Sequence, residues 1–284
     1  MHGSAPQSPR KAKDYKSEVK PIWCAGCGHF AVLSAITKSL AHLALPPEQV
    51  AIISGIGCSS RLPAYTHVYG FHGIHGRALP IATGLKVARP DLNVLVTGGD
   101  GDGFSIGGNH FMHACRRDTD LTYIVMDNEV YGMTKGQASP TTPADWTGSH
   151  LTPHGTGLPS FNPAAIALAA GAGFIARGFS GDPKGLTELI IEAIQHPGFA
   201  FIHVLSPCIT FHPEQKTWKQ EVHPQSVETT DDPLLAAQHI QQEDRMATGL
   251  IFRARPHRPE QNRVDPVTVA SLRRQFVTGP TAGG

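Results

Sequence analysis

The sequence predicts an α/β fold, in which a parallel β-sheet is covered by helices on both faces. Five short apolar stretches have the length and composition of buried strands, at residues 50–54, 93–97, 121–127, 174–177 and 199–206. Four segments with helical periodicity alternate with them, at residues 78–89, 107–117, 163–172 and 184–195. Ligands of such sheets bind at the carboxyl ends of the strands, so we expect functional residues in the loops that follow the strands.

The composition narrows the class of protein. The chain has 284 residues, with 24 Lys and Arg against 23 Asp and Glu, so its charge indicates neither nucleic acid nor an anionic membrane as a partner. The sequence contains no apolar run of 18 or more residues, so we expect no transmembrane helix. The N-terminus lacks the apolar core of a secretory signal. Five scattered cysteines do not form a secreted disulfide framework, so we expect a cytoplasmic protein whose thiols are available to a metal.

The chain divides into three predicted regions. We expect residues 1–20 to be a disordered lead-in, residues 21–211 to form the main domain, and residues 212–284 to be a C-terminal extension that packs on a partner. The extension contains one candidate amphipathic helix at residues 233–246. Within the main domain, residues 67–77 have the composition of a loop. Residues 129–162 lack periodicity, and a loop of that length in a compact domain is usually functional or faces a partner.

An acidic residue and an amide follow two neighbouring predicted strands. Asn128 comes 27 positions after Gly101, which leaves room for one helix and one strand and so returns the chain to a parallel neighbour. Asp100, Asn128 and the backbone carbonyl of Val130 are then suitable ligands for Mg²⁺, and the amides of Gly101 and its neighbours can approach a diphosphate. We interpret this segment as the Mg²⁺–diphosphate site of a thiamine-diphosphate enzyme.

Two alternatives to this interpretation stay open. The pattern also fits a tight turn combined with an Asx-turn, which carries no ligand. The register is open as well, because Asp102 lies in a Gly-Asp-Gly tripeptide like that of Asp100.

Four cysteines form the second candidate site. Cys24 and Cys27 are a close pair, whereas Cys58 and Cys208 lie far off in sequence, each in a loop after a predicted strand. Four thiolates fit a tetrahedral zinc ion or an iron–sulfur cluster. Zinc ligands usually come as two close pairs, so one pair with two distant single cysteines favours a [4Fe–4S] cluster. Cys115 lies within a predicted helix and is expected to be a buried apolar residue.

Three basic side chains are candidates for substrate or diphosphate contacts. His75 and Arg77 precede a predicted helix, and Arg61 offers a planar group that suits a carboxylate. Ordinary surface hydrogen bonds are the alternative for each of them. His110 and His113 are expected to be structural.

Several sequence strings resemble the β subunit of 2-oxoacid:ferredoxin oxidoreductases. They extend from residue 23 to residue 211 in the order found in that family: WCAGCGHF, SGIGCSSRLP, YGFHGIHGRALPIATGLKVARPDL, GGDGDGFSIGGNHFMHACRR, DNEVYGMTKGQ and SPCITF. The resemblance implies a thiamine-diphosphate-binding fold with Mg²⁺ on Asp100, Asn128 and Val130. It also implies a [4Fe–4S] cluster on Cys24, Cys27, Cys58 and Cys208.

The resemblance further implies a set of residues around the cofactor and a reaction. The expected cofactor-lining residues are Ile56, Gly57, Cys58, Ser59, His75, Gly76, Arg77, Ala78, Gly101, Asp102, Gly132 and Met133. The expected reaction is the oxidative decarboxylation of a 2-oxoacid with coenzyme A, or its reversal, with single electrons passing through the cluster to ferredoxin. We expect 2-oxoglutarate as the substrate, and pyruvate or another 2-oxoacid is the alternative.

One catalytic group that this chemistry needs is missing from the chain. In this class of enzymes, a glutamate in a separate pyrimidine-binding domain activates the cofactor, and no second α/β domain follows here. We therefore expect an α subunit as partner, in a dimer of heterodimers. A non-catalytic iron–sulfur electron carrier and a zinc-stabilised binding module are the alternatives from other classes.

Overall fold

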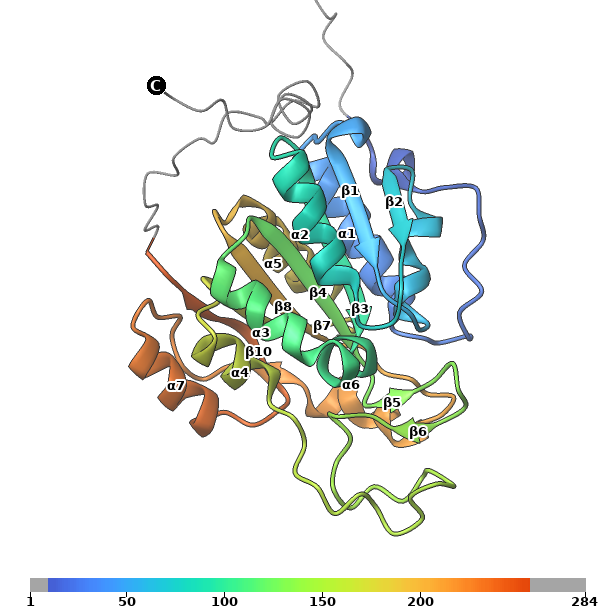
Figure 1. Cartoon of the computed structure of the whole chain (residues 1–284). Coiled ribbons are helices and arrows are strands. Elements are labelled where there is room, and N and C mark those ends of the chain that lie inside the picture. Colours follow the sequence, from blue (N-terminus) through green and yellow to red (C-terminus); the bar gives the residue numbers. More distant parts are fainter. Residues whose placement is uncertain (1–9, 256–284) are drawn as a thin grey trace, which may run out of the picture.

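The fold is a single eight-stranded sheet with helices on both faces (Figure 1), as seen in a computed structural model that describes residues 10–255. The strand order is β2-β1-β3-β4-β8-β7-β10-β9. In that order the strands are Tyr69–His72, Val50–Ser54, Asn93–Gly99, Leu121–Asp127, Phe199–Leu205, Phe174–Phe179, Ala247–Arg253 and His223–Pro224. The sheet is parallel from β2 to β7, and β10 pairs with β7 in the antiparallel direction.

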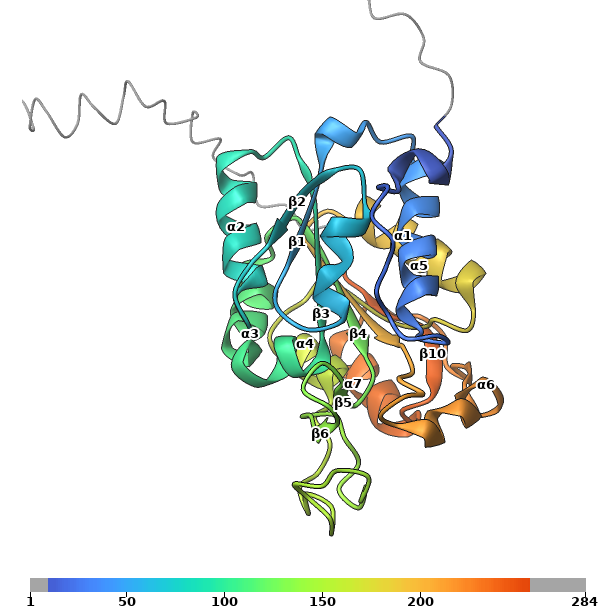
Figure 2. The same ribbon diagram turned by 90° about the vertical axis from the view of Figure 1, so that its right-hand side faces the viewer.

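Helices cover the two faces of this sheet. The helices α1 (His29–His42) and α5 (Pro183–Gln195) lie on one face, and α2 (Ala78–Ala88) and α3 (Gly108–Arg117) lie on the other (Figure 2). Strand β1 explains the arrangement: Val50 and Ile52 pack in the core beneath α1 and α5, whereas Ala51 and Ile53 pack beneath α2 and α3. Because both faces are buried, the central strands are apolar at nearly every position.

Smaller elements complete the described chain. Two short helices, α4 (Pro163–Ala169) and α7 (Pro233–Gln242), pack against each other, and α6 (Trp218–Glu221) is a single turn. A small hairpin of β5 (Val130–Tyr131) and β6 (Gln137–Ala138) opens the long loop that follows β4. The remaining turns are η1 (Ala12–Tyr15), η2 (Pro47–Gln49), η3 (Ser59–Tyr65), η4 (Gly101–Ile106, a π-helical turn) and η5 (Pro213–Thr217).

The predicted fold class is confirmed, and the central elements lie close to their predicted positions. Strands β1 and β4 begin and end where the sequence places them, and the four helices α2, α3, α4 and α5 differ from the prediction by at most three residues at their ends. The segment at residues 67–77 is not only a loop, because it contains β2 at the edge of the sheet. All residues of β2 are exposed, so this strand lacks the apolar run that marks the others.

Both terminal regions need correction. The expected disordered lead-in is ordered from residue 10, since Tyr15 is fully buried and its hydroxyl donates to the carbonyl of Leu45 at 2.6 Å. The helix expected at residues 233–246 ends at Gln242, and the chain then forms β10. The described part of the C-terminal extension therefore belongs to the main sheet, where Ile251 and Phe252 join the core beneath α2 and α3. Residues 1–9 and 256–284 lie outside the described part.

Within residues 10–255, no helix combines the length and the apolar character needed to cross a lipid bilayer.

Candidate functional site

Four loops leave the sheet at one edge, because their strands are parallel neighbours. Strands β1, β3, β4 and β8 end at Ser54, Gly99, Asp127 and Leu205. Each end is followed within four residues by one of the expected ligands, Cys58, Asp100, Asn128 and Cys208. The structure thus brings both predicted groups of ligands to the carboxyl edge of the sheet.

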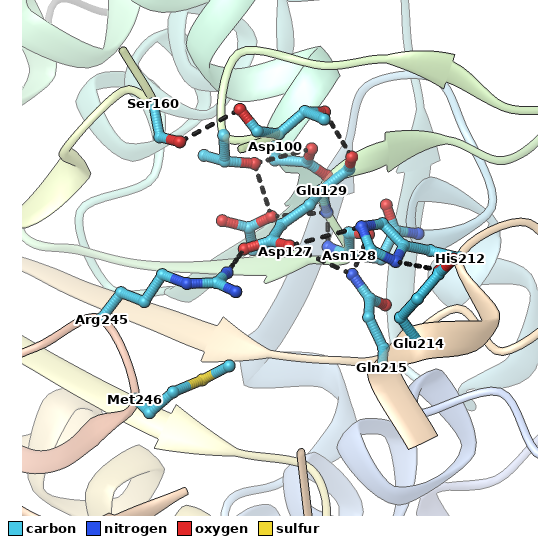
Figure 3. Close-up of polar contacts among 12 residues, drawn as sticks. Asp100, Asp127, Asn128, Glu129, Ser160, His212, Glu214, Gln215, Arg245 and Met246 are labelled. Carbon is cyan, nitrogen blue, oxygen red and sulfur yellow. Dashed lines mark hydrogen bonds and ion pairs between the residues drawn. The ribbon is translucent and has the colours of Figure 1, made fainter. Parts of the chain in front are cut away.

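Asp100 and Asn128 lie side by side and are buried. The backbone N–H of Asn128 is 3.5 Å from Oδ1 of Asp100, and the two residues are 2% and 7% exposed. The hydroxyl of Thr141, from the long loop, is 3.1 Å from Oδ2 of Asp100 and 2.8 Å from Oδ1 of Asp127. Figure 3 shows Asp100, Asp127 and Asn128 gathered in one polar cluster.

The two buried aspartates differ in how their charge is compensated. Nε2 of His203 lies 2.7 Å from Asp127, and Arg177 donates to Nδ1 of the same ring, so the tautomer of His203 with a proton on Nε2 donates to Asp127. Asp100 has no ion pair with a basic side chain among those found in residues 10–255. Burial, and then the charge of Asp127, raise the pKa of Asp100 well above its usual value.

This environment fits a divalent cation. A buried carboxylate without a cationic partner is costly, and an ion beside it would remove that cost. The side chain of Asn128 and the backbone of Val130 lie on the adjoining turn, where the N–H of Val130 donates to Oδ1 of Asn128 at 3.1 Å. Carboxylate, amide and carbonyl oxygens are the ligands that Mg²⁺ prefers.

Asp102 has different partners from Asp100, although both lie in a Gly-Asp-Gly tripeptide. Its Oδ1 accepts hydrogen bonds from the N–H of Ile56 at 2.9 Å and of Gly76 at 2.8 Å, and lies 2.8 Å from Nδ1 of His75. One carboxylate thereby joins the loops that follow β1, β2 and β3. Gly55 permits this approach, since a Cβ there would lie 2.0 Å from Oδ2 of Asp102.

Hydrogen bonds also draw the cysteine-bearing loops together. The N–H of Gly28, next to Cys27, donates to the carbonyl of Pro207, next to Cys208, at 3.2 Å. Nδ1 of His29 lies 2.8 Å from the hydroxyl of Ser206 in the same pair of loops.

The third loop is tied in by an aromatic side chain. The indole N–H of Trp23 donates to the carbonyl of Cys58 at 2.7 Å. These bonds connect all the loops that carry the expected cluster ligands.

The thiols themselves act on one another electrostatically. Burial, together with smaller contributions from Cys208, Cys58 and Cys24, raises the pKa of Cys27 to about 12. Burial likewise raises the pKa of Cys58 and of Cys208, again with contributions from neighbouring cysteines. All five cysteines are free thiols, and Cys115 is fully buried in α3 as expected.

The four cysteines are the candidate ligands of the expected [4Fe–4S] cluster. Among residues 10–255, no three His, Cys, Asp or Glu side chains converge closely enough to hold one metal ion. A [4Fe–4S] cluster is bound by one thiolate at each of four iron atoms, so its ligands are more widely spaced than those of one zinc ion. Four mutually interacting thiols that form no disulfide are consistent with such a cluster.

The remaining expected cofactor-lining residues lie in or next to the segments that follow β1, β2 and β4. Gly132 lies beside the cysteines, because a Cβ at this position would be 3.7 Å from the sulfur atoms of both Cys58 and Cys208. Met133 is about half exposed beside it. Gly57 has a positive φ of 123°, Ser59 begins η3, and Ala78 begins α2.

The two arginines differ in where they point. Arg61 belongs to η3 and lies near the cysteines, since its charge acts to lower the pKa of Cys58. Its Nε donates to the hydroxyl of Tyr65 at 3.3 Å. Arg77 reaches the carbonyl of Ile106 at 3.4 Å, at the end of the π-helical turn.

Several buried polar residues at this edge were not predicted from the sequence (Figure 3). Glu129 follows Asn128, and burial together with Asp127 raises its pKa to about 7, while an ion pair with Arg245 opposes that shift. Gln215 is 1% exposed and contacts the same turn. Trp146 stacks on His212 with a ring separation of 4.6 Å. Glu129 lies within a recognisable motif and His212 directly follows another, whereas Arg245 and Gln215 occur in stretches without one.

Comparisons with known proteins agree with this geometry. Residues 55–204, more than half of the chain, match the family model described as thiamine pyrophosphate enzyme, C-terminal TPP binding domain. The 2-oxoacid:ferredoxin oxidoreductase 2 subunit beta of Aeropyrum pernix is 42% identical over 224 residues, which cover 78% of this chain and 72% of that protein. The chain belongs to the family of 2-oxoacid:ferredoxin oxidoreductase β subunits. The predicted resemblance and the thiamine-diphosphate-binding fold are thereby confirmed.

Two further relatives of this β-subunit family are informative. The 2-oxoglutarate oxidoreductase subunit KorB of Mycobacterium tuberculosis is 48% identical over 204 residues, covering 72% of this chain. The match spans only 54% of that relative's own length. A solved structure of the 2-oxoglutarate:ferredoxin oxidoreductase from Magnetococcus marinus, with 2-oxoglutarate, coenzyme A and succinyl-CoA bound, is 40% identical. It has a TM-score of 0.85, with 98% of this chain and 94% of that chain covered.

The role of Asp102 as the link between three loops can be tested by stability. Asp102→Ala leaves two buried backbone N–H groups without an acceptor, and we expect the free energy of unfolding to fall by about 2–4 kcal/mol. Chemical denaturation of the full-length chain measures this loss. Asp120→Ala is the control, because its half-exposed carboxylate only pairs with Lys86 at the surface and is worth less than about 1 kcal/mol. Equal losses in the two variants would contradict the assignment.

Proposed function

We propose that this chain is the β subunit of a 2-oxoglutarate:ferredoxin oxidoreductase. In this reaction 2-oxoglutarate and coenzyme A give succinyl-CoA, carbon dioxide and a proton, while two ferredoxins each accept one electron. The same machinery could run in reverse as reductive carboxylation. The observation that carries the proposal is the position of four cysteines beside the Asp100–Asn128 pair at one sheet edge. Thiamine enzymes that only decarboxylate need no such cysteines.

The choice of 2-oxoglutarate rests on the relatives. The Mycobacterium tuberculosis protein is named a 2-oxoglutarate oxidoreductase subunit, and the Magnetococcus marinus enzyme contains 2-oxoglutarate and succinyl-CoA. The Aeropyrum pernix proteins carry the broader name 2-oxoacid:ferredoxin oxidoreductase, so pyruvate or another 2-oxoacid is the alternative substrate.

The thiamine-diphosphate site is assigned to the turns after β3 and β4. Asp100, Asn128 and the carbonyl of Val130 would hold Mg²⁺, and the residues tied together by Asp102 would surround the cofactor. When bound, thiamine diphosphate supplies an electron sink for the loss of carbon dioxide from a 2-oxoacid. Nδ1 of His75 lies 2.8 Å from Asp102, so the tautomer with a proton on Nδ1 donates a hydrogen bond to this carboxylate and leaves Nε2 to contact a ligand.

The cluster site is assigned to Cys24, Cys27, Cys58 and Cys208. When bound, a [4Fe–4S] cluster accepts electrons one at a time. Cys24 is the exposed member of the set, so this side of the site is open to an external electron acceptor. We assign ferredoxin as that acceptor. Five free cysteines also support a reducing, cytoplasmic location.

An α subunit would complete the active site. The buried carboxylates at this edge are Asp100, Asp102, Asp127 and Glu129, and each of them is bound within this chain. The one glutamate among these four, Glu129, is paired with Arg245, so we expect the glutamate that contacts the aminopyrimidine to come from another chain. We assign that group to the pyrimidine-binding domain of an α subunit, in a dimer of heterodimers.

The decisive experiment is a substrate panel on the assembled complex. The chain is co-produced with its α subunit without oxygen, and thiamine diphosphate, iron and sulfide are measured. We expect one thiamine diphosphate and four irons per β subunit, and reduction of a viologen dye with coenzyme A. The value of kcat/KM for 2-oxoglutarate should exceed that for pyruvate by roughly tenfold or more. Iron without thiamine diphosphate would support an electron carrier instead, and zinc without iron a binding module.

Arg61 is the residue that we assign to the distal carboxylate of 2-oxoglutarate. Arg61→Ala should raise KM for 2-oxoglutarate roughly tenfold or more, because a charged hydrogen bond is lost, while KM for pyruvate changes little. Arg89→Ala, at an exposed ion pair with Asp91, serves as the matched control. Iron content is measured alongside, since Arg61 lies close to Cys58. Equal changes in KM for both substrates would exclude this role.

A further inference from the structure

One buried side chain connects the two cofactor sites. The side-chain carbonyl of Gln215 accepts the backbone N–H of Cys208 at 2.7 Å. Its NH₂ group donates to the backbone carbonyl of Asn128 at 2.8 Å and lies 3.4 Å from Oε2 of Glu129. A single amide group therefore spans the cysteine loop after β8 and the turn after β4. Figure 3 shows Gln215 beside Asn128.

The orientation of this amide is fixed by its partners. A backbone N–H can only donate and a backbone carbonyl can only accept, so the oxygen of Gln215 must face Cys208 and the nitrogen must face Asn128. Only an amide carries an acceptor and a donor at these two positions. A glutamate carboxylate would keep the acceptor, lose the donor and face the carboxylate of Glu129, and methionine would lose both groups.

The surrounding chain holds Gln215 in place. The N–H of His212 donates to the carbonyl of Cys208 at 2.8 Å, and the N–H of Gln215 donates to the carbonyl of His212 at 3.1 Å. Two successive turns thus carry the chain from Cys208 back over its own loop. Trp218, three residues later, is 2% exposed and packs with Phe179 and Leu205. Gln215 is anchored on both sides and cannot easily turn away.

We propose that Gln215 is a positioning residue that fixes the Asn128 turn relative to the Cys208 loop and so couples the occupancy of the two cofactor sites. The inference rests on the proposed function, since it takes the turn as the Mg²⁺–diphosphate site and the loop as part of the cluster site. A shift of the Asn128 carbonyl on binding of the diphosphate is transmitted through one amide to the backbone of a cluster ligand. Hydrogen bonds near the sulfur ligands tune a cluster, so its signal should report on the thiamine site.

The test compares Gln215→Met with Gln220→Met in the assembled complex. Gln220 is exposed on α6 five residues later and is the matched control. Two quantities are measured: the Kd of thiamine diphosphate at saturating Mg²⁺, and the electron paramagnetic resonance spectrum of the reduced cluster with and without thiamine diphosphate.

In the native complex and in Gln220→Met, thiamine diphosphate should alter the cluster spectrum. In Gln215→Met that alteration should be lost and the Kd should rise roughly tenfold, because two buried backbone groups lose their partners. The coupling would be overturned if thiamine diphosphate altered the cluster spectrum of Gln215→Met as it alters that of the native complex. It would also be overturned if thiamine diphosphate left the cluster spectrum of the native complex unchanged.

A second variant, Gln215→Glu, tests the proposal if Gln215→Met does not assemble with its partner. Gln215→Glu has the same shape and keeps the acceptor for Cys208, so the cluster spectrum without thiamine diphosphate should match that of the native complex. Its Kd for thiamine diphosphate should still rise roughly tenfold, and an unchanged Kd would overturn the proposal. A native complex without iron or without thiamine diphosphate would instead overturn the proposed function.

Discussion

Parallel pairing of β1, β3, β4 and β8 is the constraint on which the rest of the structure depends. Because these strands run in one direction, their carboxyl ends meet at one edge, and the segment that follows each of these four strands carries a ligand candidate. Two polar side chains then hold the loops at fixed positions. Asp102 joins the loops after β1, β2 and β3, and Gln215 joins those after β4 and β8. The sheet brings the segments together, and these two residues determine how they face each other.

The edge carries an unusual amount of buried negative charge. Asp100 and Asp127 lie on neighbouring strand ends, and Glu129 follows on the same turn. The His203–Arg177 pair compensates Asp127, and Arg245 compensates Glu129, but Asp100 is left with hydroxyl and amide contacts alone among the pairs found in residues 10–255. Such a site costs stability in the absence of a cation and gains it when one binds. Because only Asp100 of these three carboxylates has no basic partner among the pairs found in residues 10–255, it is the one at which a cation is needed.

The sequence predicted the strands and helices that apolar periodicity marks. It did not predict the features that depend on contacts with residues distant in the chain. Strands β1 and β4 are marked by continuous apolar runs, so both the sheet and the clustering of ligands at its edge could be inferred. Asp100 and Asp102 have the same local sequence, and only the folded loops show which of them lies beside Asn128. Strand β10 and Gln215 occur in stretches of mixed composition, where local pattern carries no information on their partners.

The central claim is that a diphosphate-bound metal and an iron–sulfur cluster lie side by side at this edge. Mn²⁺ can replace Mg²⁺ at hard oxygen ligands and is paramagnetic, so it speeds the magnetic relaxation of a nearby reduced cluster. The measurement is the relaxation rate of the reduced cluster in the assembled complex with thiamine diphosphate, first with Mg²⁺ and then with stoichiometric Mn²⁺. A clearly faster relaxation with Mn²⁺ is the predicted result. Identical rates with bound Mn²⁺ and bound Mg²⁺ would place the two sites apart and contradict the account.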